Sequence, residues 1–351
     1  MRGIRNWSRL EYAEGVSGLD IYRKLFALYL LLAVVPGRYA WVAQFPDAFF
    51  VPPLGPALIF SGFPPSLFFS LVHIGIAICA VLLLAGRHVV AASYLAAALL
   101  FGGNLFAYSF GKINHDILLV LAPIVLARAW DDNPRAGHQP TNAQPLAMLA
   151  LLIALGMFSA ALPKIQSGWL VWDQPALLVH LARNFFVTER PSLLAEILLG
   201  VESLWVWKTL DYSTVLLEAG FLFAFLRFGL MRVFLAMACL FHVGVLIIMD
   251  IAFSSNVMVY AAFVSWHRRA LRRPMTWLST FGGHVRQLPL WVLMVAALLM
   301  AGAGEVVDTS GLRSFVNRTV VVLGAMVAIG YLVARLPRRD SQEEAPTAEP
   351  R

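Results

Sequence analysis

The sequence predicts an all-α integral membrane protein: a helical bundle of about ten spans, with amphipathic helices at its outer face. Two observations predict this class. Of the 351 residues, 60% are hydrophobic and only 13% are charged, whereas roughly 25% is usual in soluble domains. The apolar residues also form long runs that short basic clusters separate. Because lipid offers the backbone no hydrogen-bond partners, such runs must cross the membrane as helices.

Ten apolar runs are candidate spans. Several are shorter than the ~20 residues that an ideal span needs, so their ends are approximate. They cover residues 25–40, 66–84, 89–109, 116–130, 145–162, 213–226, 232–249, 251–266, 288–303 and 319–336.

Basic residues predict the orientation of these spans. With the N-terminus inside, 19 of the 27 Lys and Arg residues fall on the inner side, as the positive-inside rule requires. We therefore expect an integral membrane protein with both termini cytoplasmic. It would consist of a transmembrane domain over 1–336 and a disordered tail over 337–351. Although the net charge is +7, no nucleic-acid-binding motif is present, so no nucleic-acid partner is predicted.

Two outer segments are unusual. Residues 45–65 contain six prolines and no basic residue, which indicates an ordered apolar loop. Residues 164–212 are predicted to form a cap in the outer interface, built from amphipathic helices over 175–186 and 191–207. Such a cap would place nearby functional groups at the periplasmic or extracellular face.

Polar and ionisable groups at the ends of apolar runs are candidate functional residues, because they are costly in lipid. Asn114 and His115 precede the fourth run, where a helix N-terminus favours an anion; the alternative is that Asn114 or Asp116 simply caps the helix. Lys164 follows the fifth run. If sheltered, it would act as a neutral amine base; the alternative is a snorkelling lysine at a helix end.

Two further candidates lie inside the later runs. His242 lies in the middle of the seventh run, where interhelical hydrogen bonding and a ligand-site role are equally compatible with the sequence. Glu218 lies in the sixth run and would be able to pair with His242 or Lys164. We count both as candidate substrate-binding residues. Motifs of soluble enzymes and Cys/His metal clusters are absent, so no metal is predicted.

These groups fall into an ordered pattern. Asn114-His115 comes first, followed by F-x-x-A-x-x-K-I-x-x-G-W over 158–169, and then F-H at 241–242 with I-x-F-x-x-x-V-M over 251–258. The pattern resembles the membrane domain of vitamin K-dependent γ-glutamyl carboxylases and the related bacterial horizontally transferred transmembrane (HTTM) family. The resemblance covers most of residues 7–335.

The resemblance implies a quinone-dependent chemistry. Lys164 matches the family's base, and Asn114 and His115 match the Asn-His pair that the family places beside the quinone. Trp169 keeps the family's spacing from Lys164. The resemblance thus implies Lys164 and His115 as catalytic residues and Asn114 and Trp169 as cofactor-binding residues. His242 matches a histidine near the family's substrate pocket. The implied cofactors are a reduced quinone (vitamin K or menaquinone hydroquinone) and O2, with CO2 in addition if the reaction is γ-carboxylation.

One departure from the family affects the expected substrate. Its carboxylases carry a large soluble domain after the spans, whereas this sequence has a short tail there, so we expect a partner to supply any recognition of a protein substrate. Beside a carboxylase-like or epoxidase enzyme we keep a non-enzymatic accessory membrane protein for peptide export or maturation, and a transporter. The expected partners are membrane lipid and a peptide or protein substrate or partner subunit.

Overall fold

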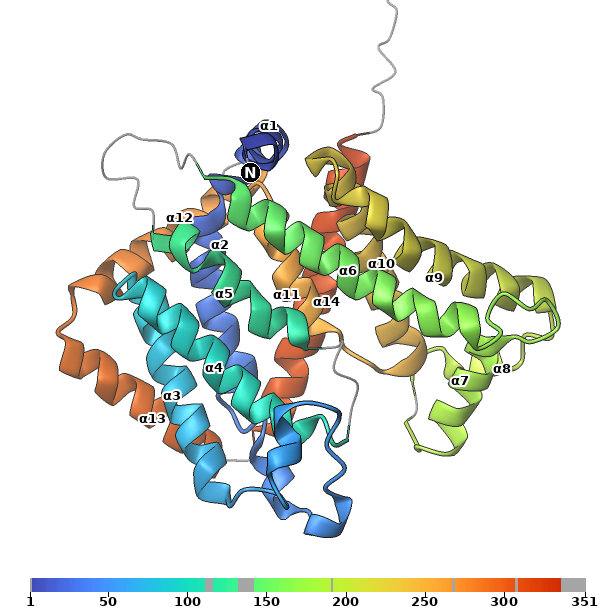
Figure 1. Ribbon diagram of the computed structural model, residues 1–351, viewed down its shortest axis with the longest axis horizontal. Helices are drawn as coiled ribbons and strands as arrows, with labels where there is room; N and C mark the ends of the chain where they lie inside the picture. Colours follow the sequence, from blue (N-terminus) through green and yellow to red (C-terminus); the bar gives the residue numbers. More distant parts are fainter. Residues whose placement is uncertain are drawn as a thin grey trace, which may run out of the picture.

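A computed structural model describes residues 2–110, 116–131, 142–190, 192–266, 269–306 and 309–335, and within them every regular element is a helix. The predicted all-α class is therefore confirmed for the described chain. Asn114, His115 and the predicted tail lie outside these ranges. The helices (Figure 1) are α1 (Arg2–Val16), α2 (Leu19–Tyr29), α3 (Ser66–Ala85), α4 (Val89–Ala107), α5 (Ile117–Asp131), α6 (Gln144–Gln166), α7 (Ala176–Phe186), α8 (Ala195–Leu199), α9 (Leu204–Ala224), α10 (Phe228–Met249), α11 (Ser254–Tyr260), α12 (Arg269–Gln287), α13 (Leu290–Val306) and α14 (Ser310–Val333).

Five described helices are long and apolar enough to cross a membrane: α3, α4, α6, α10 and α14. A sixth candidate is the pair Met275–Gln287 and Leu290–Gly304, whose two parts meet at a bend of 115°. Several such helices mark a membrane protein. The prediction of about ten spans is not confirmed, because only five or six of the described helices meet the length and composition of a span.

Local breaks explain the difference in number. The first predicted run divides between α2 and a π-helical turn over Leu30–Val34, and the run at 251–266 holds the seven-residue helix α11 and a short 3-10 turn over Ala261–Phe263. Helix α5 is 15 residues long, which is short for a span. Each of the ten apolar runs thus contains helical structure, but not every one is a continuous span.

The outer cap differs from the prediction in its second half. The first predicted amphipathic helix is confirmed as α7. The second, over 191–207, is wrong: α8 has five residues and ends before Gly200, and α9 begins at Leu204. The cap therefore ends near residue 203, since residues 204–212 belong to α9. The last span also begins earlier than predicted, at Ser310 rather than at residue 319.

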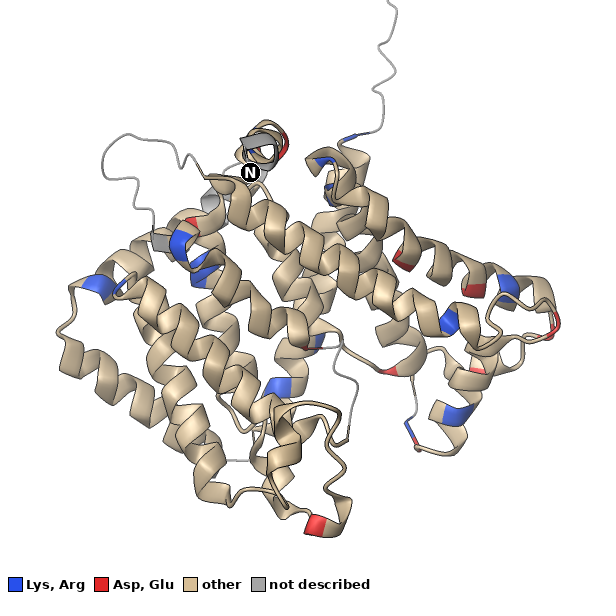
Figure 2. Ribbon diagram, in the orientation of Figure 1, with Lys and Arg blue, Asp and Glu red and all other residues tan. Residues whose placement is uncertain are grey.

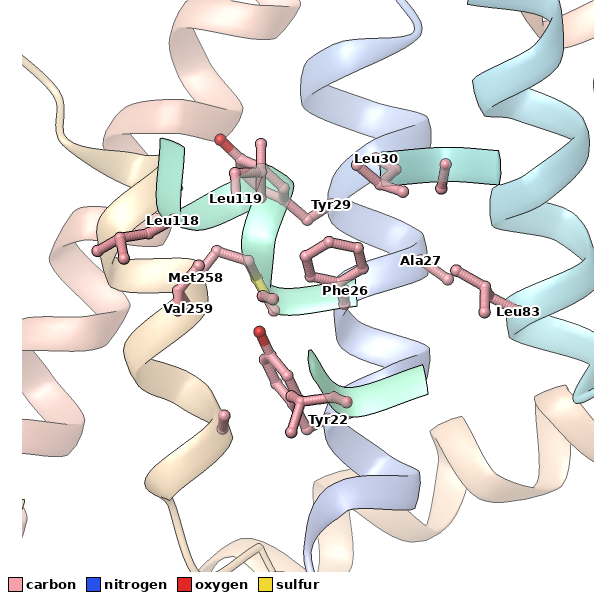
Figure 3. Packing of buried hydrophobic residues seen from close by; sticks show 14 of the residues in the cluster. Tyr22, Phe26, Ala27, Tyr29, Leu30, Leu83, Leu118, Leu119, Met258 and Val259 are labelled. Carbon is pink, nitrogen blue, oxygen red and sulfur yellow. The ribbon is translucent and has the colours of Figure 1, made fainter. Parts of the chain in front are cut away.

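The hydrophobic core is centred on α2. Figure 3 shows Tyr22 and Phe26 of this helix packed among side chains from α3, α5 and α11, including Leu83, Leu119 and Met258. The rings of Phe26 and Trp130 lie 5.3 Å apart. This aromatic packing joins α2, near the start of the chain, to elements that follow much later in the sequence.

Charged residues are scarce along the helices, as Figure 2 shows. Those that are buried among the described residues all form hydrogen bonds or ion pairs, which is the usual condition for burying charge. They are Arg23, Lys24, Lys208, Asp211 and Glu218. Three of the five lie on α9, so this helix and its neighbours are where a polar site is most concentrated.

Candidate functional site

The end of α6 positions Lys164 and Trp169 beside each other. Ser167 caps the helix, and Gly168 follows with a φ of +85°, the left-handed conformation in which glycine ends many helices. A Cβ at Gly168 would lie 2.6 Å from Oε1 of Gln174. The turn brings the buried Trp169 ring to 5.5 Å from the Lys164 ammonium, a cation–π distance.

Lys164 forms an ion pair with Glu218 of the adjacent helix α9. Its Nζ lies 2.6 Å and 2.5 Å from the two carboxylate oxygens. The lysine side chain is 22% exposed, whereas that of Glu218 is 6% exposed. Lys164 is therefore half of an ion pair. Of the two partners that the sequence allows for Glu218, His242 and Lys164, the structure pairs it with Lys164.

His242 is buried on α10 in a separate but neighbouring arrangement. Its Nε2 lies 3.3 Å from the hydroxyl of Tyr260, with the donor set by the histidine tautomer. The Phe253 ring stacks on the imidazole at 4.8 Å between centroids. The Tyr260 hydroxyl in turn donates to Sδ of Met157 on α6, 3.6 Å away. His242 thus takes part in interhelical bonding, one of the two roles left open by the sequence.

Tyr260 lies between His242 and α6. Its hydroxyl contacts His242 Nε2 and Met157 Sδ, and Met157 precedes Lys164 by two turns of α6. His242 and Tyr260, here called the polar group, therefore pack against the helix that carries Lys164. Sequence reasoning missed Tyr260, because a tyrosine in an apolar run carries no signal that separates it from an ordinary core residue.

A second ion pair, Lys208–Asp211, fixes the cap. Both side chains are fully buried and their charged atoms are 3.0 Å apart. Lys208 also donates to the carbonyl of Trp169 at 2.6 Å. Asp211 accepts the backbone N–H groups of Ala176 and Leu177 at the start of α7. This pair, which the sequence did not predict, is structural and holds Trp169 in place.

A polar cavity of about 360 Å³ lies apart from the Lys164–Glu218 pair. Its wall includes Arg38 and Asp116, which form an ion pair at 2.5 Å. Asp116 immediately follows the predicted pair Asn114-His115, which lies outside the described residues. Phe253 lines the cavity and stacks on His242, so one ring separates the cavity from the polar group.

No family model, curated protein or solved structure matches this chain. The similarity to the HTTM family therefore stays a prediction, and the functional argument rests on the geometry. Within the described ranges, no group of three or more His, Cys, Asp or Glu side chains is arranged to hold a metal ion. Among the described residues, the ionisable groups that are best placed to carry chemistry are the Lys164–Glu218 pair and the residues that line the cavity.

Proposed function

We propose that this chain is a membrane enzyme that deprotonates a reduced quinone at the Lys164–Glu218 pair. The observation that carries the proposal is the pair itself: an ammonium held 2.5–2.6 Å from a buried carboxylate between apolar helices. Ion pairs in such surroundings cost desolvation free energy, and ionisable groups within membrane helices commonly serve function. The lysine retains the exposure that a reactant would need.

The pair is able to act as a two-step proton relay. Lys164 gives one proton to Glu218 and takes the proton of a quinol hydroxyl, so that one proton moves in total from the quinol to Glu218. Lys164 ends as an ammonium beside the new phenolate, whose negative charge it stabilises. This assigns the proton acceptor to Glu218 and the contact with the reactant to Lys164.

The surroundings of Lys164 suit a quinone. The Trp169 ring offers a flat wall next to the ammonium, and Leu162 and Ile165 on the last turns of α6 are each 41% exposed, which suits contact with an isoprenoid chain in lipid. A bound reduced quinone would supply its own oxidation by O2, which yields the quinone epoxide and water. A carboxylase would use the same step to deprotonate a carbon acid, to which CO2 then adds.

The experiment follows epoxide formation from reduced menaquinone or vitamin K, with O2, by purified protein in lipid nanodiscs. We expect turnover by the wild type and its loss in Lys164→Met and in the double variant Lys164→Met/Glu218→Leu. Removal of one partner leaves a buried charge and destabilises the fold, whereas replacing both with apolar groups is close to neutral. The double variant therefore separates loss of chemistry from loss of folding.

A matched control removes another interhelical ion pair. Arg232 and Glu14 lie 3.5 Å apart. Gly15, next to Glu14, packs against Leu146 at the start of α6, whereas Lys164 lies at the end of that helix, so Arg232→Met/Glu14→Leu should leave turnover unchanged. Turnover by a folded Lys164→Met/Glu218→Leu variant at the wild-type rate would overturn the proposal. So would a folded wild type that binds reduced quinone and forms no epoxide.

A second candidate function is an accessory role in peptide export or maturation. It is favoured by the outer loop over 45–65, where Leu54 and Ile59 are 93% and 81% exposed. Exposed apolar surface of this kind commonly binds another protein or lipid. An inactive wild type from which Leu54→Ser/Ile59→Ser removes a copurifying peptide or subunit would favour this role over the enzyme.

A further inference from the structure

Helix α12 crosses one end of the bundle instead of running along it (Figure 1). It turns into α13 at a bend of 115°. Arg87, two residues after α3, donates to the carbonyl of Leu288 at 2.9 Å, so α13 begins beside the end of α3. At the far end of α13, a Cβ at Gly304 would lie 3.0 Å from Cα of Pro36. Because α13 packs along the candidate span α3, α12 lies close to the plane of the membrane.

One face of α12 is packed onto the bundle. Leu278, Gly282 and Val285 recur at intervals of four and three, which places them on one side of a helix, and all three are buried. A Cβ at Gly282 would lie 3.0 Å from Cε of Lys24 on α2 and 3.3 Å from the carbonyl oxygen of Leu84 on α3. This face therefore fixes α12 against α2 and the end of α3.

An exposed aromatic pair lies beside this buried face. Trp277 and Phe281 are 64% and 38% exposed, and their rings stack with centroids 5.5 Å apart. At 3.6 residues per turn, Trp277 lies about 100° and Phe281 about 60° around the helix axis from the buried Leu278. With its buried face toward the bundle, α12 directs this flank sideways, along the membrane surface. Tryptophan is enriched at that level in membrane proteins.

Exposed apolar surface continues from α12 onto α13. Trp291, in the first turn of α13, is 69% exposed, and Leu298 and Leu299 farther along are 48% and 69% exposed. Because α13 packs along α3, which is long and apolar enough to cross a membrane, its exposed apolar side chains face lipid. Aromatic residues on both sides of the bend thus adjoin a lipid-facing surface.

The charge of this part of the chain favours anionic lipid. Residues 251–304 contain five arginines and no Asp or Glu. The one nearest to α13 is exposed, so its charge is accessible to a ligand. Amphipathic helices that combine basic residues with exposed aromatic side chains lie in the membrane interface and bind anionic lipids. The five arginines lie in α12 or next to it: Arg268, Arg269, Arg272, Arg273 and Arg286.

We propose that α12 is an interfacial helix that binds the surface of an anionic lipid bilayer. Trp277 and Phe281 enter the boundary between head groups and acyl chains, and the positive charge of the segment attracts anionic head groups to the same level. The occupant is the bilayer that surrounds the protein, because the aromatic flank of α12 is continuous with the lipid-facing surface of α13. The site does not rest on the function proposed for the Lys164–Glu218 pair.

The test measures which lipids surround α12 in full-length protein reconstituted in phosphatidylcholine nanodiscs. Cys79 and Cys239 are replaced with alanine, and Thr280→Cys, at an exposed position of α12, carries a fluorophore. A small fraction of phosphatidylglycerol or phosphatidylcholine bears a nitroxide near the head group, which quenches the fluorophore at short range. We expect phosphatidylglycerol to quench several-fold more than phosphatidylcholine at equal mole fraction. Equal quenching would overturn the proposal, and so would no quenching, which would mean that water or another protein covers this flank.

Arg286→Gln should roughly halve the preference for phosphatidylglycerol, because each basic residue near an anionic surface adds to the attraction. The matched control is Arg183→Gln, which removes the same charge from an exposed arginine of α7 in the cap and should leave the preference unchanged. Raising the salt concentration should lower the preference in the wild type, since salt screens exposed charges. Equal reductions in the two variants, or none in Arg286→Gln, would contradict the role given to the charge of α12.

Trp277→Ser/Phe281→Ser tests the aromatic half of the proposal. Both side chains are exposed, so their loss leaves the buried face of α12 in place and should not lower the unfolding temperature in detergent. It should reduce quenching by both nitroxide lipids, because the flank no longer favours the interface. The matched control, Trp172→Ser/Trp205→Ser, removes another exposed aromatic pair, whose ring centroids lie 4.4 Å apart in the cap and α9, and should not change the quenching. Unchanged quenching in Trp277→Ser/Phe281→Ser would contradict the insertion of the pair.

Discussion

Two lysines on neighbouring elements show how surroundings separate a structural residue from a candidate catalytic one. Lys208 is fully buried, and its described partners belong to the cap or to α9. They are the carboxylate of Asp211, two backbone carbonyls and the ring of Tyr212. Lys164 keeps partial exposure and faces one carboxylate and one indole ring. The first arrangement leaves a reactant no access, whereas the second does. Composition and spacing do not distinguish them.

Lys208→Met is therefore expected to act on stability. The substitution leaves Asp211 buried without its counter-ion, which costs about 3–5 kcal/mol, and it releases the carbonyl of Trp169. Thermal unfolding in detergent would measure the loss. Lys208→Met should unfold well below Lys164→Met/Glu218→Leu; equal unfolding temperatures for the two would contradict the structural role.

Among the elements, the turn that ends α6 has the clearest consequence for the site. Gly168→Ala places a Cβ at a φ of +85° and 2.6 Å from Gln174 Oε1, with a strain of roughly 1–2 kcal/mol. We expect a lower unfolding temperature and slower quinol turnover, because Trp169 and Lys164 are positioned by this turn. Gly244→Ala is the control.

Gly244 lies inside α10. Apart from the adjacent residues and the backbone of the helix itself, no atom of the described residues lies within 4 Å of the place that its Cβ would take in an alanine variant. Alanine there should raise helix stability by up to about 1 kcal/mol and leave turnover unchanged. A Gly168→Ala protein as stable and active as Gly244→Ala would show that the left-handed turn is not what positions the Lys164–Trp169 contact.

Helix α9 shows where sequence reasoning about elements succeeds and fails. The apolar run at 213–226 predicts its second half. The first half, from Leu204, contains Lys208 and Asp211, whose charges suggest an interfacial segment until their mutual pairing is known. Because that pairing removes the cost of burying them, the helix continues through them. Hydropathy alone measures each residue separately and does not detect such compensation.

For the whole molecule, hydropathy predicts a helical membrane protein, which the structure supports, whereas its number of about ten spans is not confirmed, since five or six described helices meet the length and composition of a span. Three predicted site residues, Lys164, Trp169 and Glu218, come together, although Glu218 lies 54 positions beyond Lys164. The cavity beside the Arg38–Asp116 pair was not predicted, because the residues that line it are distant in sequence. Contacts of this kind depend on how the helices pack.

The predicted orientation is a property of the whole molecule and is tested by cysteine labelling. The two native cysteines, Cys79 and Cys239, are buried, so replacing both with alanine gives a cysteine-free protein that the maleimide does not label. In intact cells, a membrane-impermeant maleimide should label Leu54→Cys in the outer loop. It should label Trp277→Cys on α12 only after permeabilisation with a detergent that also frees α12 from lipid, because the basic clusters near α12 predict the cytoplasmic side. The reverse pattern would invert the assigned topology.

The most direct test of the central claim is the rate of quinone epoxide formation by Glu218→Gln, with bound quinone quantified in the same sample. The amide keeps the shape of the carboxylate and an oxygen that accepts from Lys164, but it does not accept the relayed proton. We predict a rate at least about 100-fold below that of the wild type, the usual scale for loss of a general base, with quinone still bound. A Glu218→Gln rate equal to the wild-type rate would contradict the relay.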